Sequence, residues 1–321
     1  MERKRVVVSE YIDPAGLEIL RAGSDVLYFP DVRGASLNQV IADADGLGVR
    51  VARVTAELMD AAPHLKVIAK HGVGYDNIDV AAATQRGIVV VTTPKANSVS
   101  VSEHLLALML GLANRVCAAD ADLKAGRFRK REDYIGVELK DKTLGVVGIG
   151  RIGSETVTKC RLGFGMNVIA YDPYVPPERF ETLGCWRSGD LARVVREADF
   201  LALCVPLTAE TRGMLGEREL ALMKPTAYLI NTSRGGIVDE DALYRALVAG
   251  RLAGAGMDVF VEEPPAADHP LLSLPNFIAT PHVAGATVEA MRRMATHLAD
   301  EILRVLRGER PLYPVNPEVY E

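Results

Sequence analysis

Cysteine is scarce in this sequence, and the few that occur form no recognisable set. The four are Cys117, Cys160, Cys185 and Cys204. They include no CxxC pair and have no histidine at ligand spacing, so the pattern favours neither a disulfide framework nor a zinc site. We therefore expect four reduced thiols, no bound metal and a cytoplasmic location.

The sequence also lacks long apolar runs and an excess of positive charge. Its longest apolar run, residues 105–113, is far shorter than the roughly 20 residues of a membrane-spanning helix. Only three apolar residues lie between the basic start and Ser9, so residues 1–10 predict a first strand rather than an export signal. The formal net charge of −5 argues against a nucleic-acid partner, which requires a basic face. We expect neither a membrane nor a nucleic acid as partner.

Short β-branched runs alternate with amphipathic segments along the whole chain. A chain of 321 residues is too long to fold around a single hydrophobic core. Its composition, 49% hydrophobic and 25% charged residues, is typical of a globular protein. The alternation predicts βαβ units and largely parallel sheets, an α/β fold in two lobes. The expected strands are 5–9, 65–69, 88–91, 143–147, 168–171, 200–205, 227–231, 254–258 and 277–279, and the clearest helices are 13–22, 241–249 and 288–306.

The boundary between the lobes is predicted at residues 93–98. Pro94 ends a strand there, and Asn97 or Ser98 can cap a long helix that runs to about Leu112. A second boundary is expected near Thr287, because the chain after it forms one long helix and a tail that return to the first lobe. The domains are then 1–97 with 288–321, which is discontinuous, and 98–287.

A glycine motif in the second domain predicts a dinucleotide site. An expected strand runs directly into G-x-G-x-x-G and then into a helical pattern. Gly148 makes the tight turn, Gly150 lets a pyrophosphate approach the backbone, and Gly153 lets the helix pack close to the strand. The first helical residues, Arg151 and Ile152, present free amides to the phosphates. Alone the motif is a weak signal, because a glycine-rich turn without a ligand gives the same pattern.

An acidic residue strengthens this prediction and selects the cofactor. Asp172 ends the next expected strand, nineteen residues after Gly153, where a carboxylate accepts hydrogen bonds from the adenosine ribose. Alone it would be read as a turn aspartate before Pro173. The order of strand, glycines, helix, strand and acid favours a dinucleotide. The acid repels a 2′-phosphate and Tyr174 supplies no compensating charge, so NAD is favoured over NADP.

Three successive expected strands each end in a residue suited to carbonyl reduction. Hydride transfer to a ketone leaves negative charge on its oxygen, so the site needs a proton donor and a cation. Arg234 follows the strand at 227–231, Glu262 and Glu263 follow the next, and His282 follows the last. The carboxyl ends of parallel strands meet at one sheet edge, where ligands bind. Taken singly, each residue would more often be an ordinary loop or surface side chain.

These stretches resemble the D-isomer-specific 2-hydroxyacid dehydrogenases over nearly the whole chain. The residues that carry the resemblance are 148–153, 231–235, 258–260 with 263–264, and 280–282. Short phosphoglycerate dehydrogenase-like members without a regulatory domain are the most similar in pattern. The resemblance implies an NAD-dependent oxidoreductase with two doubly wound parallel-sheet lobes, a Rossmann cofactor domain and a flavodoxin-like substrate domain with a cleft between them.

The resemblance also implies roles for individual residues. It makes His282 the acid/base, Glu263 its partner and Arg234 the residue that holds the substrate, and it places Asp258 against the nicotinamide carboxamide. Glu263 directly precedes a proline as in the family pattern, and Glu262 stays the alternative. A homodimer formed through the cofactor domain is implied as well.

A loop of the first domain is predicted to bind the substrate acid. The segment 70–79 reads KHGVGYDNID, and its glycines can offer backbone amides to a carboxylate. The composition is equally that of a tight turn, but the family uses this loop, with Val73 and Gly74, for the substrate. Phosphite dehydrogenase has a lysine at the position of Val73, and formate dehydrogenase has a more elaborate N-terminal region, so both related activities are disfavoured.

Two basic residues indicate a substrate with a second anionic group. Arg50 and Lys70 each close an apolar run and should lie at strand ends. Phosphoglycerate dehydrogenases have basic residues at these places for the phosphate, which predicts a substrate such as 3-phosphoglycerate or sulfolactate. If both side chains are merely solvated, hydroxypyruvate or glyoxylate reductase is the alternative. Outside the enzymes, the alternative is a corepressor-like protein that senses NAD.

Overall fold

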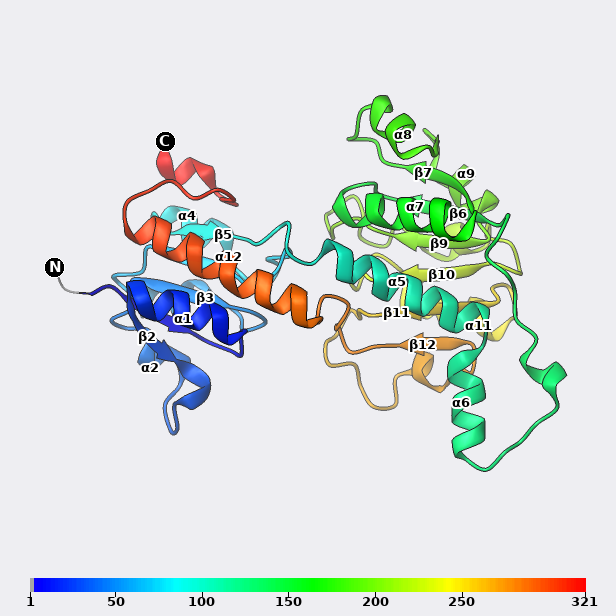
Figure 1. The fold of residues 1–321 in the computed structure, drawn as a ribbon, viewed down its shortest axis with the longest axis horizontal. Helices are drawn as coiled ribbons and strands as arrows, with labels where there is room; N and C mark the ends of the chain where they lie inside the picture. The colour runs from blue at the N-terminus through cyan, green and yellow to red at the C-terminus, as the bar shows by residue number, and fades with distance from the viewer. Residues whose placement is uncertain (1–2) are drawn as a thin grey trace. The chain divides into compact units, whose positions relative to one another are not determined.

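The computed structural model describes residues 3–321, which form two compact units (Figure 1). Unit 1 comprises Met1–Asn97 and Ala286–Glu321, and unit 2 is Ser98–Gly285. The sequence prediction divided the chain after 97 and after 287, whereas the units divide it after Asn97 and after Gly285. The ligands assigned to the two domains stay predictions.

Unit 1 is built on a five-stranded parallel sheet with the order β2-β1-β3-β4-β5, which is the flavodoxin-like order. Its strands are β1 (Arg5–Val8), β2 (Asp25–Tyr28), β3 (Gly46–Val49), β4 (Val67–Lys70) and β5 (Val89–Val91). Its helices are α1 (Pro14–Gly23), α2 (Leu37–Val40), α3 (Ala56–Asp60), α4 (Val80–Gln85) and α12 (Val288–Leu306).

Both faces of the unit 1 sheet are covered. Alternate strand residues point to opposite faces, so Val6 and Val8 pack with α1 and α12 while Val7 packs with α3 and α4. Figure 1 shows α1 and α12 side by side over one face. The C-terminal helix therefore belongs to the same core as the first strand.

Unit 2 is built on a seven-stranded parallel sheet with the order β12-β11-β10-β9-β6-β7-β8. Counted from β6, this is the Rossmann order with one added strand. Its strands are β6 (Thr143–Val147), β7 (Asn167–Tyr171), β8 (Trp186–Arg187), β9 (Phe200–Leu203), β10 (Tyr228–Asn231), β11 (Gly254–Met257) and β12 (Phe277–Ala279). Its helices are α5 (Ser98–Ala113), α6 (Val116–Lys124), α7 (Arg151–Phe164), α8 (Pro177–Leu183), α9 (Leu191–Glu197), α10 (Glu217–Leu220) and α11 (Glu240–Val248).

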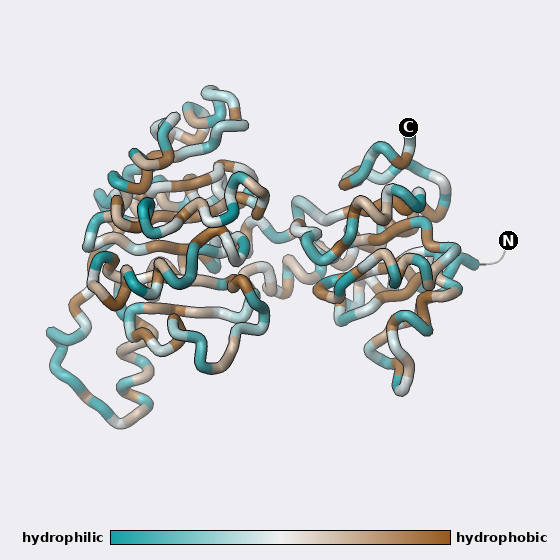
Figure 2. The backbone as a smooth tube through the Cα atoms, turned by 180° about the vertical axis from the view of Figure 1, so that it is seen from behind, coloured by the Kyte–Doolittle hydropathy of each residue, from teal (hydrophilic) through white to brown (hydrophobic). Residues whose placement is uncertain are grey.

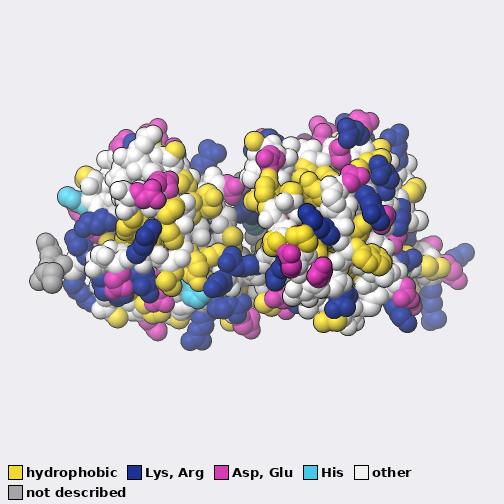
Figure 3. Space-filling view, turned by 90° about the horizontal axis from the view of Figure 1, so that it is seen from above, with side chains coloured by type: hydrophobic (Ala, Val, Ile, Leu, Met, Phe, Trp, Pro, Cys, Tyr) yellow, Lys and Arg dark blue, Asp and Glu magenta, His cyan; other side chains and the backbone are white. Residues whose placement is uncertain are grey.

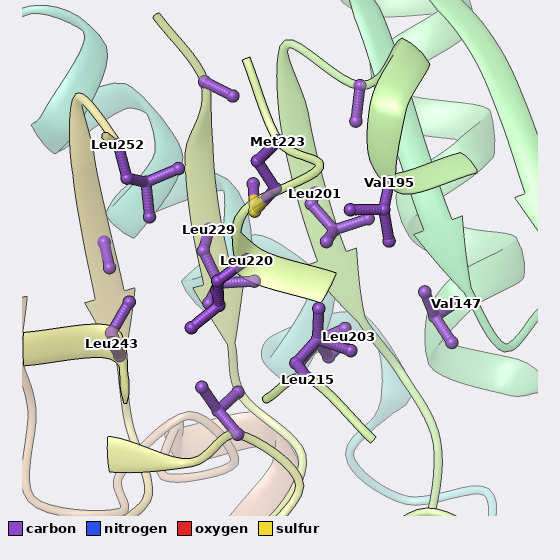
Figure 4. Packing of buried hydrophobic residues seen from close by; sticks show 14 of the residues in the cluster. Val147, Val195, Leu201, Leu203, Leu215, Leu220, Met223, Leu229, Leu243 and Leu252 are labelled. Carbon is purple, nitrogen blue, oxygen red and sulfur yellow. The ribbon is translucent and has the colours of Figure 1, made fainter. Parts of the chain in front are cut away.

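The unit 2 sheet also has helices on both faces. One face packs on α5, α7 and α8, and the other on α9, α10 and α11. Figure 4 shows the second cluster, in which Leu201, Leu203 and Leu229 of the strands meet Val195 and Leu243 of the helices. The prediction of two doubly wound α/β sheets is confirmed.

Apolar residues are concentrated in the strands of each unit, where Figure 2 shows the backbone mostly brown. On the face shown in Figure 3, basic and acidic side chains are interspersed rather than segregated. No helix within residues 3–321 combines the length and apolarity that crossing a bilayer requires. In the same range, no group of three or more His, Cys, Asp and Glu residues has an arrangement that could hold a metal ion.

Candidate active site

The turn between β6 and α7 is closed at two of its glycines and open at the third. Gly148 has φ +90°, and a Cβ there would lie 2.6 Å from the carbonyl oxygen of Cys204. A Cβ on Gly153 would lie 2.0 Å from the carbonyl oxygen of Gly148. At Gly150, by contrast, an added Cβ would meet no heavy atom of the described chain within 4 Å. Only Gly150 thus faces space that a pyrophosphate can enter.

Polar groups around this turn complete a site that fits a dinucleotide. No side chain of the described chain caps the N-terminus of α7, so the amides of its first residues, Arg151 and Ile152, have no capping partner. The carboxylate of Asp172 lies directly after β7 and accepts the amides of Ile149 and Tyr174, each at 3.0 Å. Each of its oxygens keeps a lone pair for a ligand hydroxyl. The structure thus brings the predicted acid to the predicted turn.

His282 and Glu263 form a hydrogen-bonded pair on the loops after β12 and β11. Nδ1 of His282 lies 2.7 Å from Oε2 of Glu263, and Oε1 of the same carboxylate accepts the Phe260 amide at 3.1 Å. Burial raises the pKa of Glu263, but the hydrogen bond and charge of His282, the Phe260 amide and the charge of Arg234 together lower it below its ordinary value. The carboxylate is therefore ionised beside the imidazole. Of the two adjacent acids, Glu262 and Glu263, it is the carboxylate of Glu263 that contacts the histidine.

The backbone at His282 adopts a conformation that non-glycine residues rarely take. Its φ is +53°, in the left-handed region, and its amide donates to the carbonyl oxygen of Asp258 at 2.8 Å. The carboxylate of Asp258 accepts the next two amides, those of Val283 and Ala284, both at 2.8 Å. One buried aspartate therefore holds three consecutive amides of the loop that carries the histidine. Its predicted contact with the nicotinamide carboxamide stays a prediction.

Arg234 lies in the loop after β10, where Asn231 fixes the backbone. The Asn231 side chain donates to the Arg234 carbonyl oxygen and accepts the Ser233 amide, both at 3.0 Å. The guanidinium of Arg234 donates to the Ser233 carbonyl oxygen at 2.6 Å, and its charge contributes to the low pKa of Glu263. Unit 2 thus brings an arginine, a glutamate and a histidine together at the carboxyl ends of β10, β11 and β12.

In unit 1, the loop after β3 is held by a carboxylate that the sequence analysis did not single out. Oε2 of Glu10 accepts the Arg50 amide at 2.6 Å, and Oε1 accepts the amides of Val51 and Ala52 at 2.7 and 2.8 Å. The Ser9 hydroxyl donates to the same carboxylate at 2.7 Å. Burial raises the pKa of Glu10, but these four donors together lower it below its ordinary value.

Two carbonyl oxygens of the same loop accept hydrogen bonds from the side chains of Lys70 and Asn77. The Lys70 ammonium donates to the carbonyl oxygen of Arg50 and, at 2.6 Å, to Oδ1 of Asn77. The Asn77 side chain in turn donates to the carbonyl oxygen of Ala52 at 2.7 Å. We call Glu10, Lys70 and Asn77 the loop clamp. Lys70, predicted to meet an anionic group of the substrate, therefore has a role in holding the loop, and its contact with substrate stays a prediction.

The two basic residues predicted from the sequence differ in their surroundings. Within residues 3–321, the Arg50 guanidinium forms no hydrogen bond or ion pair, whereas the Lys70 ammonium is bonded to two oxygens of the protein. The neighbouring loop at 72–74 is anchored by the Gly72 amide, which donates to the Thr93 hydroxyl at 3.0 Å. Val73 in that loop is exposed.

Comparison with known proteins identifies the family of the chain. The family model for "D-isomer specific 2-hydroxyacid dehydrogenase, NAD binding domain" matches residues 106–284. The chain belongs to this family. The family predicted from the sequence is confirmed.

Individual relatives of the chain are named for different substrates. The chain is 44% identical to D-3-phosphoglycerate dehydrogenase of Methanocaldococcus jannaschii over 95% of its own length, but it spans only 58% of that protein. It is 40% identical to glyoxylate reductase of Thermococcus litoralis over 99% of its own length and 98% of that protein. Among solved structures, D-lactate dehydrogenase from Aquifex aeolicus, complexed with NAD and lactic acid, is 33% identical with a TM-score of 0.83, and the match covers 95% of this chain and 96% of that one.

Proposed function

We propose that the protein is an NAD-dependent D-2-hydroxyacid dehydrogenase that also reduces the corresponding 2-keto acid. The observation that carries this proposal is the contact of 2.7 Å between Nδ1 of His282 and Oε2 of Glu263, beside the charge of Arg234. When bound, the nicotinamide cofactor supplies or accepts the hydride. The chain's own residues supply the proton and the positive charge.

In this proposal His282 is the acid/base. Its Nδ1 is held by Glu263, so its Nε2 is the atom that donates to the substrate oxygen during reduction and accepts during oxidation. The ionised glutamate stabilises the imidazolium and fixes the orientation of the ring. Arg234 binds the substrate carboxylate, for which the planar guanidinium provides two parallel donors.

We propose NAD rather than NADP on the basis of Asp172. Its carboxylate lies beside the glycine turn, where it can accept hydrogen bonds from both ribose hydroxyls. A 2′-phosphate at the same place would meet a carboxylate at close range, and the repulsion of like charges disfavours it. Relative rates with NADH and NADPH test this assignment directly.

For the substrate we propose a 2-keto acid whose tail is anionic, contacted by Arg50. We choose Arg50 over Lys70 because, within residues 3–321, the Arg50 guanidinium forms no hydrogen bond or ion pair, whereas the Lys70 ammonium forms hydrogen bonds to the protein. The backbone of the loop that carries Arg50 is held in place by Glu10 and Lys70. 3-Phosphohydroxypyruvate and sulfopyruvate have such tails, whereas hydroxypyruvate and glyoxylate do not. If kcat/KM is higher for hydroxypyruvate or glyoxylate, which lack an anionic tail, the protein is instead a hydroxypyruvate or glyoxylate reductase.

The full chain assayed with these four keto acids tests the proposal. With NADH as donor, we expect its absorbance to fall with at least one of these keto acids. With NADPH as donor, we expect the oxidation of the cofactor to be slower. Binding of NADH without turnover on any keto acid would instead favour a corepressor-like protein that senses NAD.

We also propose that the protein is a homodimer formed through unit 2. The segment that includes α6 projects away from the unit 2 sheet in Figure 1. It exposes four large apolar side chains: Val116 at 56%, Leu123 at 63%, Phe128 at 87% and Ile135 at 72%. Apolar groups exposed in such number on one segment are typical of a protein interface. Analytical ultracentrifugation of the full chain measures the oligomeric state.

The four cysteines support a reducing compartment such as the cytoplasm. All four are free thiols. Burial raises the pKa of Cys160 to about 12, so its thiol is protonated and unreactive at neutral pH.

A further inference from the structure

A second histidine reaches the candidate site from helix α5. Nε2 of His104 lies 2.8 Å from Oγ1 of Thr280, which in turn lies 2.6 Å from Oδ1 of Asp258. The direct distance from His104 Nε2 to Asp258 Oδ1 is 3.6 Å. All three residues belong to unit 2. They connect α5 to the loop that carries His282.

The number of protons fixes the direction of each hydrogen bond. A carboxylate can only accept, so the Thr280 hydroxyl donates its single proton to Asp258. Thr280 Oγ1 must then accept from His104, which requires a proton on Nε2 of that imidazole. The geometry therefore assigns His104 either the Nε2–H tautomer or the doubly protonated form.

This chain of hydrogen bonds ends on the backbone of the acid/base residue. The Asp258 side chain has no exposed surface, and it holds the loop through the amides of Val283 and Ala284 while its carbonyl oxygen accepts the His282 amide. A buried carboxylate is stable only when donors satisfy it. A hydroxyl that is itself accepting a hydrogen bond is polarised and becomes a stronger donor.

We propose that His104 is a positioning residue for His282, acting through Thr280 and Asp258. The proposal rests on the proposed function only in that His282 is the acid/base. Because His282 has a left-handed backbone, its loop depends on the Asp258 contacts to keep that conformation. Loss of the His104 donor frees the Thr280 hydroxyl to rotate, weakens its bond to Asp258 and loosens the loop.

Two substitutions at position 104 separate positioning from simple packing. His104→Leu introduces an apolar side chain of similar size that has no donor, whereas His104→Gln keeps an N–H donor. We expect His104→Leu to lower kcat about 10- to 100-fold, the cost of misplacing a reacting group, with the KM for NADH unchanged. We expect His104→Gln to recover kcat to within about threefold of wild type. Glu103→Gln, at the exposed neighbouring position on α5, is the matched control and should match wild type.

A spectroscopic readout tests the hydrogen bond without turnover. ¹⁵N NMR of the histidine rings in the full chain should report a proton on Nε2 of His104, and Thr280→Val should shift that resonance while leaving the His64 resonances in place. A neutral ring protonated only at Nδ1 overturns the proposal. Equal loss of kcat in the Leu and Gln variants, or no loss in either, overturns it as well. If wild type turns over none of the keto acids, the proposed function fails, and the NMR result still decides the His104 link.

Discussion

Nδ1 of His282 donates to Oε2 of Glu263 across 2.7 Å, and this contact orients the imidazole relative to the loop after β11. The pKa of Glu263 is lowered although burial alone would raise it, so an ionised carboxylate lies beside the ring. In the proposed mechanism, the other ring nitrogen, Nε2, exchanges the proton with substrate.

His282→Ala is expected to reduce kcat by about 10²- to 10⁴-fold, because general acid/base catalysis contributes on this scale. Binding of NADH should be unchanged, since the imidazole acts on the substrate oxygen. Stopped-flow turnover and fluorescence titration with NADH measure the two quantities. His64→Ala, at an exposed site of unit 1, is the control. Retention of half the wild-type kcat by His282→Ala would exclude the assigned role.

Replacing the two adjacent glutamates separately should identify the partner of His282. Glu263→Gln is nearly isosteric but removes the charge beside the imidazole, so we expect kcat to fall by about 10²-fold. Glu262→Gln alters only an exposed side chain and should leave kcat within about twofold, because exposed substitutions away from a site have small effects. If Glu262→Gln were the more damaging variant, the assignment of Glu263 would be wrong.

Asp172→Ala should weaken NADH binding and reduce the preference of the enzyme for NADH over NADPH. Charge-assisted hydrogen bonds of about 1.5–3 kcal/mol are lost, which corresponds to roughly a 10- to 100-fold rise in KM for NADH. The ratio of kcat/KM for the two cofactors gives the preference. Glu181→Gln on the exposed side of α8 is a charge-matched control. A wild-type enzyme that already prefers NADPH would contradict the role given to Asp172.

Arg50 and Lys70 should differ in what their loss affects. Arg50→Ala is expected to lower kcat/KM for 3-phosphohydroxypyruvate and sulfopyruvate by at least about tenfold relative to glyoxylate, because a charge-assisted contact is lost only for anionic tails. Lys70→Met removes a support of the loop and should lower all rates together, along with Tm. Arg53→Ala, exposed in the same loop, is the control. An unchanged ratio among the substrates in Arg50→Ala rules out the anionic tail.

Glu10 should contribute stability that depends on pH. Its folded-state pKa lies below the ordinary value of 4.5, so folding favours the ionised carboxylate. The contribution is therefore fully present above pH 4.5 and is lost as the pH falls through the folded-state pKa. We expect Glu10→Gln to lower the free energy of unfolding by about 1–3 kcal/mol at pH 7. Urea unfolding at neutral pH and below pH 4 should show this difference shrinking on acidification; a constant difference would contradict it.

The sequence predicted most strands because they are buried on both faces and therefore read as continuous apolar runs. Three strands were missing from the expected set. The edge strand β2 is only partly buried and both residues of the edge strand β8 are exposed, so neither segment shows the apolar pattern. The strand β3 is central and buried, but two of its four residues are glycines, which are depleted in strands. The strand expected at 254–258 ends at Met257, which places Asp258 in the loop, where its carboxylate can turn back to the backbone.

The grouping of Arg234, Glu263 and His282 was predictable because each follows a strand and the ends of these strands meet at one sheet edge. Glu10 and His104 were not. Glu10 binds backbone amides forty residues further along the chain, and backbone amides leave no signature in the sequence. His104 lies in a helix that is otherwise largely apolar, and its partner Thr280 is 176 residues away. Both contacts depend on the packing of elements that only the folded chain brings together.

The loop clamp has a consequence for how the protein can vary. Glu10, Lys70 and Asn77 hold residues 50–52 through main-chain groups alone, and Val51 is 74% exposed. The path of the loop is thus independent of which side chains it carries. Mutation at positions 50 and 51 can change the side chains available to a ligand while the backbone stays in place. A library randomised at these two codons, with the clamp kept intact, should yield folded proteins with altered substrate preferences far more often than a library that includes Glu10.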